Sequence, residues 1–91
     1  MNNKTRKQLT KLAEKIYDLA NEIDRLREEL QEIAEQEQEK YDNMPEQLQE
    51  AENGCRMYEC IEALEEVADR LDNNISEIYD ISNDVEHITE I

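Results

Sequence analysis

The stretch LTKLAEKIYDLANEIDRLREELQEI, residues 9–33, decides the fold that the sequence predicts. Its leucines and isoleucines recur at alternating steps of three and four residues, the spacing that keeps side chains on one stripe of an α-helix. A disordered segment has no reason to keep this phase, so the stretch predicts a helix that packs against another helix. The members of this ladder are Leu9, Leu12, Ile16, Leu19, Ile23, Leu26, Leu30 and Ile33.

In heptad notation the ladder occupies positions a and d, beginning with Leu9 at a and Leu12 at d. A row of alanines runs beside it at position e and is interrupted once, by Arg27. We expect the a and d residues to face a second helix of the same chain, with the alanine row half exposed beside them. The alanines are Ala13, Ala20 and Ala34.

A proline-containing segment interrupts the helical pattern after the ladder. Pro45 is unfavourable inside a helix but suits a first turn, because it lacks a backbone N–H. Asn43 and Glu46 match a capping box, in which the two side chains satisfy free amide groups at a helix start. A connection this short favours two antiparallel helices. The predicted elements are a helix over about residues 5–40, a turn over about 41–45 and a helix over about 46–89.

The second helix has a wider apolar stripe than the first. From Ile61 onward, positions a, d and g of each heptad are mostly apolar, and Ala68 and Ser82 also occupy position a. A single partner helix covers two such rows rather than three. The stripe consists of Ile61, Leu64, Val67, Leu71, Ile75, Ile78, Ile81 and Val85.

Two irregularities interrupt the pattern of the second helix. The apolar register slips between Tyr58 and Ile61, and with Gly54 nearby this slip predicts a kink near residues 54–60. The polar run over residues 72–74 is a second weak point, at which the helix either continues or breaks.

Three apolar rows per helix are more than a two-helix hairpin can cover. Two hairpins packed together would bury the remaining rows. The predicted fold class is therefore all-α, an antiparallel hairpin of long, coiled-coil-like helices that assembles into an oligomeric helical bundle. We expect the hairpin to form one domain over residues 1–91, and a homodimer before a higher assembly.

The net charge of −15 is large for 91 residues and is unevenly distributed. Residues 1–15 carry five cations and one carboxylate, whereas residues 44–91 carry fourteen carboxylates and two arginines. A chain this acidic repels nucleic acid and anionic membranes, so we expect it to bind neither directly. The sequence contains no apolar run of transmembrane length and no signal-peptide core near its start, which predicts a cytoplasmic protein.

The sequence offers little for catalysis or metal binding. Cys55 and Cys60 lie five residues apart, so their thiols point in different directions on a helix, and the single histidine is His87. Carboxylate pairs such as Glu62 and Glu66 lie on predicted solvated faces, where nothing raises a pKa for acid–base chemistry. There is no glycine-rich phosphate loop. We therefore expect no enzymatic activity, no cofactor and no metal site.

Two regions carry residues suited to ligand binding. The basic arm, Lys4 to Lys15, either holds an anion or pairs with carboxylates of the second helix. The turn region combines tyrosines with cations, which suits stacking on a base and contact with a phosphate, although such residues also cap helices and hold turns. The candidates in and beside the arm are Arg6, Lys7, Lys11 and Tyr17, and those at the turn are Lys40, Tyr41, Asn43, Arg56 and Tyr58.

The turn sequence YDNMPE, residues 41–46, resembles a group of small acidic helical proteins that bacteriophages and prophages encode. The close similarity covers roughly residues 37–54, and acidic heptads continue on either side. Residues 53–56 depart from the group, which has more uniformly Ser, Glu, Arg and Gly after the turn. The resemblance implies a phage-like setting, in which small proteins often bind a host defence or regulatory factor stoichiometrically.

These observations lead to three hypotheses for function. The first is a non-enzymatic binding protein of an infected or lysogenic bacterium, which sequesters a small nucleotide signal between the helices of an oligomer or binds a host protein. The second is a structural coiled-coil adaptor. The third is an acidic mimic of nucleic acid that inhibits a basic host protein.

Overall fold

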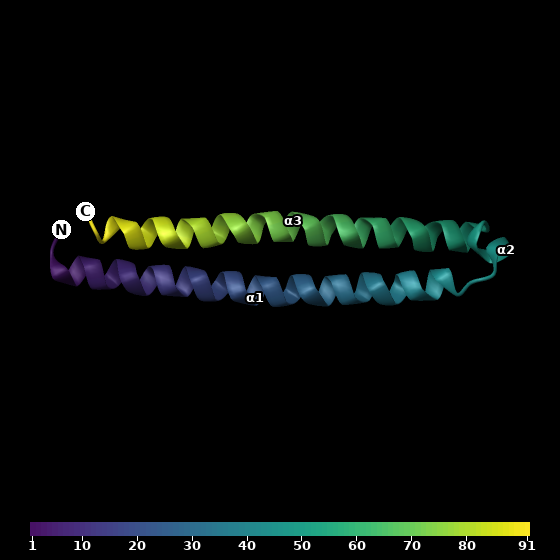
Figure 1. Ribbon diagram of the computed structural model, residues 1–91, viewed down its shortest axis with the longest axis horizontal. Helices are drawn as coiled ribbons and strands as arrows, with labels where there is room; N and C mark the ends of the chain where they lie inside the picture. Colours follow the sequence, from purple (N-terminus) through teal and green to yellow (C-terminus); the bar gives the residue numbers. More distant parts are fainter. The chain divides into compact units, whose positions relative to one another are not determined.

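The computed structural model describes all residues 1–91 and contains helices but no strands. Helix α1 spans Asn3–Asp42, the short helix α2 spans Glu46–Gln49, and helix α3 spans Glu52–Ile88 (Figure 1). The predicted all-α class is confirmed. None of the helices is both long enough and apolar enough to cross a membrane.

Helix α1 is longer at both ends than the sequence predicted. The backbone N–H of Thr5 donates to Oδ1 of Asn2 at 2.8 Å, which satisfies one of the amide groups left free at a helix start. This cap lets the helix begin before Thr5. At the other end, the backbone N–H of Asn43 still donates to the carbonyl of Glu39 at 3.1 Å, so the helix continues to Asp42.

The predicted capping box at the start of the second helix is wrong. Asn43 lies in the turn that follows α1, and the residue before the first turn of α2 is Pro45, with no side-chain hydrogen bond capping the helix. The length of α1 explains the difference. The chain uses Asn43 and Met44 to leave α1, and the backbone N–H of Met44 donates to the carbonyl of Tyr41 at 3.1 Å.

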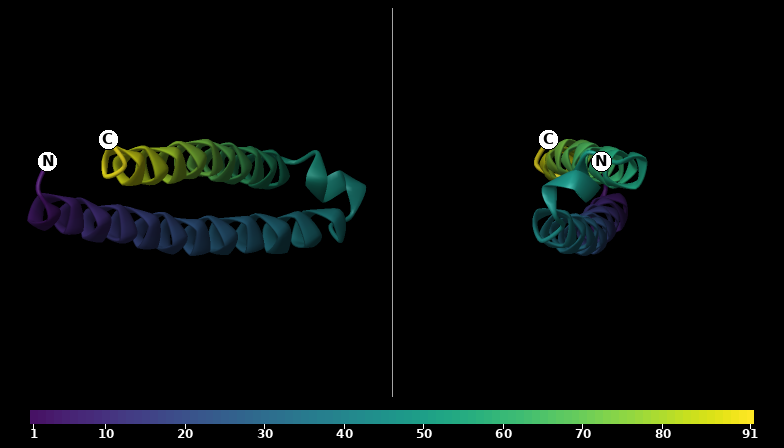
Figure 2. Two further views of the ribbon diagram at one scale, coloured as in Figure 1. Left: turned by 60° about the vertical axis from the view of Figure 1, so that its left-hand side comes forward. Right: turned by 90° about the vertical axis from the view of Figure 1, so that its right-hand side faces the viewer.

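The second predicted helix is divided into α2 and α3. Figure 2 shows α2 as a separate short turn between the end of α1 and the start of α3. The interruption falls at residues 50–51, before the kink that the sequence predicted at 54–60. The possible break at residues 72–74 does not occur, because Leu71 and Ile75 on either side pack against α1 and keep α3 continuous.

Gly54 explains where the interruption lies. This glycine is buried in the first turn of α3, against the carbonyl groups at the end of α2. A Cβ atom at this position would overlap the carbonyl oxygens of Leu48 and Gln49 and would lie 2.7 Å from the carbonyl carbon of Gln49. The side-chain amide of Gln49 also donates to the carbonyl of Tyr41 at 2.7 Å, which ties α2 to the end of α1.

The contacts divide the chain into two compact units. Unit 1 consists of Met1–Arg25 and Leu71–Ile91, so the start of α1 packs with the end of α3. Unit 2 consists of Leu26–Arg70 and contains the end of α1, all of α2 and the start of α3. The predicted helix pairing is therefore confirmed within each unit, whereas the single domain and the oligomeric bundle stay predictions.

In unit 1 the two helices run antiparallel and share a buried interface (Figure 1). The hydroxyl of Ser82 on α3 donates to the carbonyl of Ala13 on α1 at 2.8 Å, and both residues are buried. One heptad along each helix, Ala20 and Ile75 are buried as well. The register set by the Ser82–Ala13 bond places these two opposite each other, so a small residue of α1 leaves room for a large residue of α3.

Unit 2 also buries a small residue of α1 and a large residue of α3. Ala34 of α1 is buried, and on α3 the buried residues are Gly54, Ile61 and Ala68. Ile61 is only 1% exposed, and it is the largest side chain that is fully enclosed. The alanine row of α1 therefore lies in the interface in this unit too.

The buried row of α1 differs from the one that the sequence suggested. We expected the d row to face α3 and the alanine row to be half exposed, and the structure reverses the two. Alanine allows a closer approach of α3 than leucine does, so α1 turns its small residues inward and its d row outward. The d row is exposed at Leu12 (50%), Leu19 (56%), Leu26 (56%) and Ile33 (47%), whereas Leu9, Ile16, Ile23 and Leu30 are half-buried.

On α3 the apolar rows differ in burial. The predicted register slip is absent, because Gly54 and Met57 continue the inward side of α3 while Cys55 and Tyr58 are exposed. The g row points outward, since Val67 is 43% and Ile81 is 42% exposed. Of the other stripe residues, Ile61 and Ile75 are buried, and Leu64, Leu71, Ile78 and Val85 are half-buried.

Candidate association surface and ligand-binding regions

An apolar surface remains on each unit after α1 and α3 have packed together. On α1 each exposed apolar residue of the d row precedes its neighbour in the interface by one position, as Leu19 precedes Ala20. On α3, Ile81 likewise precedes Ser82. One residue corresponds to a rotation of about 100° around a helix. Because the helices are antiparallel, the same rotation away from their interface brings both exposed rows to one face of the unit.

We call this surface the apolar face. The half-buried residues beside the exposed rows, such as Ile16 and Ile78, widen it. Exposed apolar rows of this kind are typical of surfaces at which proteins associate. Its exposed residues are Leu12, Leu19, Ile81 and Ile88 in unit 1 and Leu26, Ile33 and Val67 in unit 2.

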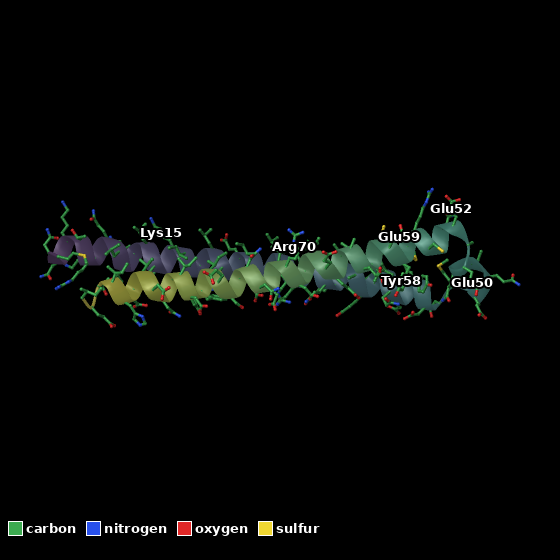
Figure 3. The ribbon with its side chains drawn as sticks, turned by 90° about the horizontal axis from the view of Figure 1, so that it is seen from above. Lys15, Glu50, Glu52, Tyr58, Glu59 and Arg70 are labelled. Atoms are coloured by element: carbon green, nitrogen blue, oxygen red, sulfur yellow. The ribbon has the colours of Figure 1, made fainter.

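Charged residues of both signs border the apolar face. Unit 1 has Lys15 on α1 and Asp84 on α3, and unit 2 has Glu29 on α1 and Arg70 on α3. Each follows an exposed apolar residue by three positions, as Lys15 follows Leu12. Figure 3 shows Lys15 and Arg70 on the surface of their helices. None of the four forms an ion pair within the chain, so all four are available to a partner.

The basic arm lies at the start of α1, where the helix dipole already makes the backbone positive. The first turn of α1 contains no acidic residue that would offset this charge. None of the lysines of the arm forms an ion pair, so the suggested pairing of the arm with the second helix is not formed. The arm lines a shallow hollow made by Arg6, Lys7, Thr10, Lys11, Glu14 and Thr89.

Arg6 contributes a buried polar atom to this hollow. Its Nε atom is buried and has no hydrogen-bond partner. Leaving a buried donor without an acceptor costs about 1–3 kcal/mol. An anion held in the hollow would be close to the guanidinium group and to the lysines beside it, so this part of the arm suits an anionic ligand.

Tyr17 does not line the basic hollow. Its ring lies 5.1 Å from the ring of Tyr79, at an interplanar angle of 55°, and the Tyr79 hydroxyl donates to Oδ1 of Asn21. Partial burial, and then the charge of Asp24, raise the pKa of Tyr79. Tyr17 lines a different hollow, whose acidic residues are unsuited to an anion; they are Glu14, Asp18 and Glu86.

The cations of the turn region already have carboxylate partners on their own helices. Nζ of Lys40 lies 3.0 Å from Oε1 of Glu37, and a guanidinium nitrogen of Arg56 lies 2.6 Å from Oε1 of Glu52. Asn43 is exposed in the turn. The turn region therefore presents less free positive charge to a phosphate than its sequence suggested.

The two tyrosines of the turn region lie together, with the rings of Tyr41 and Tyr58 5.7 Å apart. Figure 3 shows Glu50, Glu52 and Glu59 in the same part of unit 2 as Tyr58. The acidic surroundings and the neutralised cations make this tyrosine pair a packing contact rather than an anion site.

A hydrogen bond to Glu62, followed by the negative charge of that residue, raises the pKa of Tyr58 above the ordinary value of 10.0. We predict that Glu62→Gln lowers the pKa of Tyr58, followed by carbon-13 NMR of the labelled tyrosine rings. Because the raised pKa belongs to the folded state, its contribution to stability is complete below pH 10.0 and is lost as the pH rises through the folded pKa. Glu66→Gln is the control and should leave this titration unchanged.

The remaining residues add no candidate site. No group of three or more histidine, cysteine, aspartate or glutamate side chains is arranged to hold a metal ion. Cys55 and Cys60 are exposed and form no disulfide. Comparison with known proteins finds no matching family model, no matching curated protein and no matching solved structure.

Proposed function

We propose that this chain is a non-enzymatic binding protein that works as a self-associated helical bundle. The observation that carries the proposal is the apolar face, where Leu19 and Leu26 are each 56% exposed in the single chain. Removing apolar surface from water contributes about 25 cal/mol per Å². A two-fold dimer buries the same surface on both copies, and two paired α1–α3 segments would then form a four-helix bundle.

Sedimentation equilibrium of the full chain tests this proposal. One chain has a mass of 10.8 kDa, so we expect a measured mass of twice this value or a higher multiple. The mass should fall toward that of one chain on dilution, as mass action requires. A mass of one chain at every concentration would contradict self-association.

We further propose that the assembled protein takes a small anionic ligand at the basic arm, in keeping with the nucleotide signal considered above. The unpaired lysines, the positive end of the α1 dipole and the unsatisfied Nε of Arg6 support this choice. The likeness of the turn to phage proteins supports stoichiometric capture of a host defence or regulatory factor in the cytoplasm of an infected cell.

Lys11→Gln should weaken the binding of such a ligand by about tenfold, because one charge-assisted hydrogen bond contributes about 1.5 kcal/mol. The measurement is isothermal titration with pyrophosphate and with mono-, di- and cyclic nucleotides. Arg25→Gln is the matched control, since it removes an exposed cation of α1 outside the hollow. Absence of binding by every probe, or equal loss in both variants, would contradict the site.

A structural adaptor is the second candidate, and the apolar face supports it equally. Self-association without any nucleotide binding would favour this function. The acidic mimic is the third candidate, supported by the fourteen carboxylates of residues 44–91. Competition with DNA for a basic host protein would distinguish the mimic from the adaptor.

A further inference from the structure

We propose that a second copy of this chain covers the apolar face, packed so that α1 of each copy lies across α3 of the other. This inference rests on the proposed self-association and adds the partner and its orientation. The observation behind it is that each unit has one pair of exposed charges of opposite sign bordering the face, one on α1 and one on α3. Such a pair becomes complementary to the same pair of a second copy that is related by a two-fold axis.

In unit 1 the pair consists of Lys15 on α1 and Asp84 on α3. Both are exposed, and they form no ion pair with each other or with another residue. A two-fold axis parallel to the helices sets α1 over the partner's α3 at the same level. Lys15 then lies beside the partner's Asp84 at the edge of the interface, and the symmetric pair forms at the other edge.

Unit 2 has the same arrangement with the signs exchanged. Glu29 on α1 is negative and Arg70 on α3 is positive, and both are exposed and form no ion pair. Residues 44–91 contain only two arginines, and one of them stands at this edge of the face. A two-fold axis parallel to the helices of this unit sets Arg70 beside the partner's Glu29.

One position of the border is not complementary in this orientation. Glu22 on α1 follows Leu19 by three residues, and Glu77 on α3 stands one heptad before Asp84. The proposed packing brings Glu22 close to the partner's Glu77, where two like charges repel. Glu22→Gln should therefore tighten the dimer, by up to about threefold, instead of leaving it unchanged.

The decisive experiment is a charge exchange measured by sedimentation equilibrium. Lys15→Glu should weaken the dimer by about tenfold, because two edge pairs of each dimer become repulsive. Adding Asp84→Lys should restore the affinity to within about threefold of the original. Adding Asp69→Lys restores the net charge but not the pair, because exposed Asp69 follows Val67 by about 200° of rotation and so lies on the other side of α3. This control should leave the dimer weak.

A different rescue would overturn the orientation. If α1 lay across the partner's α1 instead, Asp84→Lys would not restore the Lys15→Glu variant. Rescue by Asp84→Lys and Asp69→Lys alike would show that only net charge matters, and it would also overturn the inference. If the original chain were monomeric, the proposed self-association would be contradicted. That result differs from a failed rescue, which contradicts only the orientation.

Discussion

Replacing both Leu19 and Leu26 by serine should convert the self-associated protein into single chains. Each leucine is 56% exposed in the single chain, so burial of its exposed part contributes about 1 kcal/mol. A dimer contains four such side chains, and their loss raises the dissociation constant by about a thousandfold. The fold of each chain should persist, because neither side chain belongs to the buried interface between α1 and α3.

Sedimentation equilibrium measures the dissociation constant, and circular dichroism checks that the helices remain. Leu48→Ser is the matched control, since Leu48 is also a leucine and is 53% exposed, but it lies in α2 outside the apolar face. This control should associate like the original chain. If it dissociated as readily as the double variant, general loss of apolar surface would be the cause and the apolar face would lose its assigned role.

The helices and their pairing could be predicted from the sequence, but the choice of inward row on α1 could not. The a row, which includes Ile16 and Ile23, forms a stripe with the d row, and it forms a second stripe of the same spacing with the alanine row, which only Arg27 interrupts. Hydrophobicity favours the stripe with Leu19, whereas close approach favours the stripe with Ala20. Which of the two stripes faces α3 depends on the residues of α3 that lie opposite, such as Ile75. The sequence of α1 alone does not identify these residues.

The charged residues of the candidate sites could also be predicted from the sequence only in part. The sequence identified the cations Lys40 and Arg56, and their partners Glu37 and Glu52 were readable as neighbours three and four residues away. In a chain this acidic, however, nearly every cation has such neighbours, so spacing alone does not tell which pairs form. The free lysines of the basic arm and the charges that border the apolar face became distinct only when the rotation of each helix was known.

Gly54→Ala should lower the stability of the chain by about 2 kcal/mol, although the same change in an ordinary helix interior raises stability by about 1 kcal/mol. The added Cβ would overlap the carbonyl oxygens of Leu48 and Gln49, so α2 must move away from α3. That movement strains the hydrogen bond from the Gln49 side chain to the carbonyl of Tyr41. We expect the thermal midpoint to fall by about 10 °C in a domain of this size.

The control is Asn53→Ala, one residue away on the same turn of α3. Asn53 is exposed, so alanine there should be neutral or slightly stabilising. Both variants must be melted at one chain concentration, because association shifts the midpoint. A rise in the thermal midpoint of Gly54→Ala would contradict the close contact between Gly54 and the carbonyl groups of α2. If the thermal midpoint falls for Gly54→Ala and not for Asn53→Ala, the missing side chain of Gly54 determines where the chain reverses. The register slip that the sequence predicted between Tyr58 and Ile61 does not.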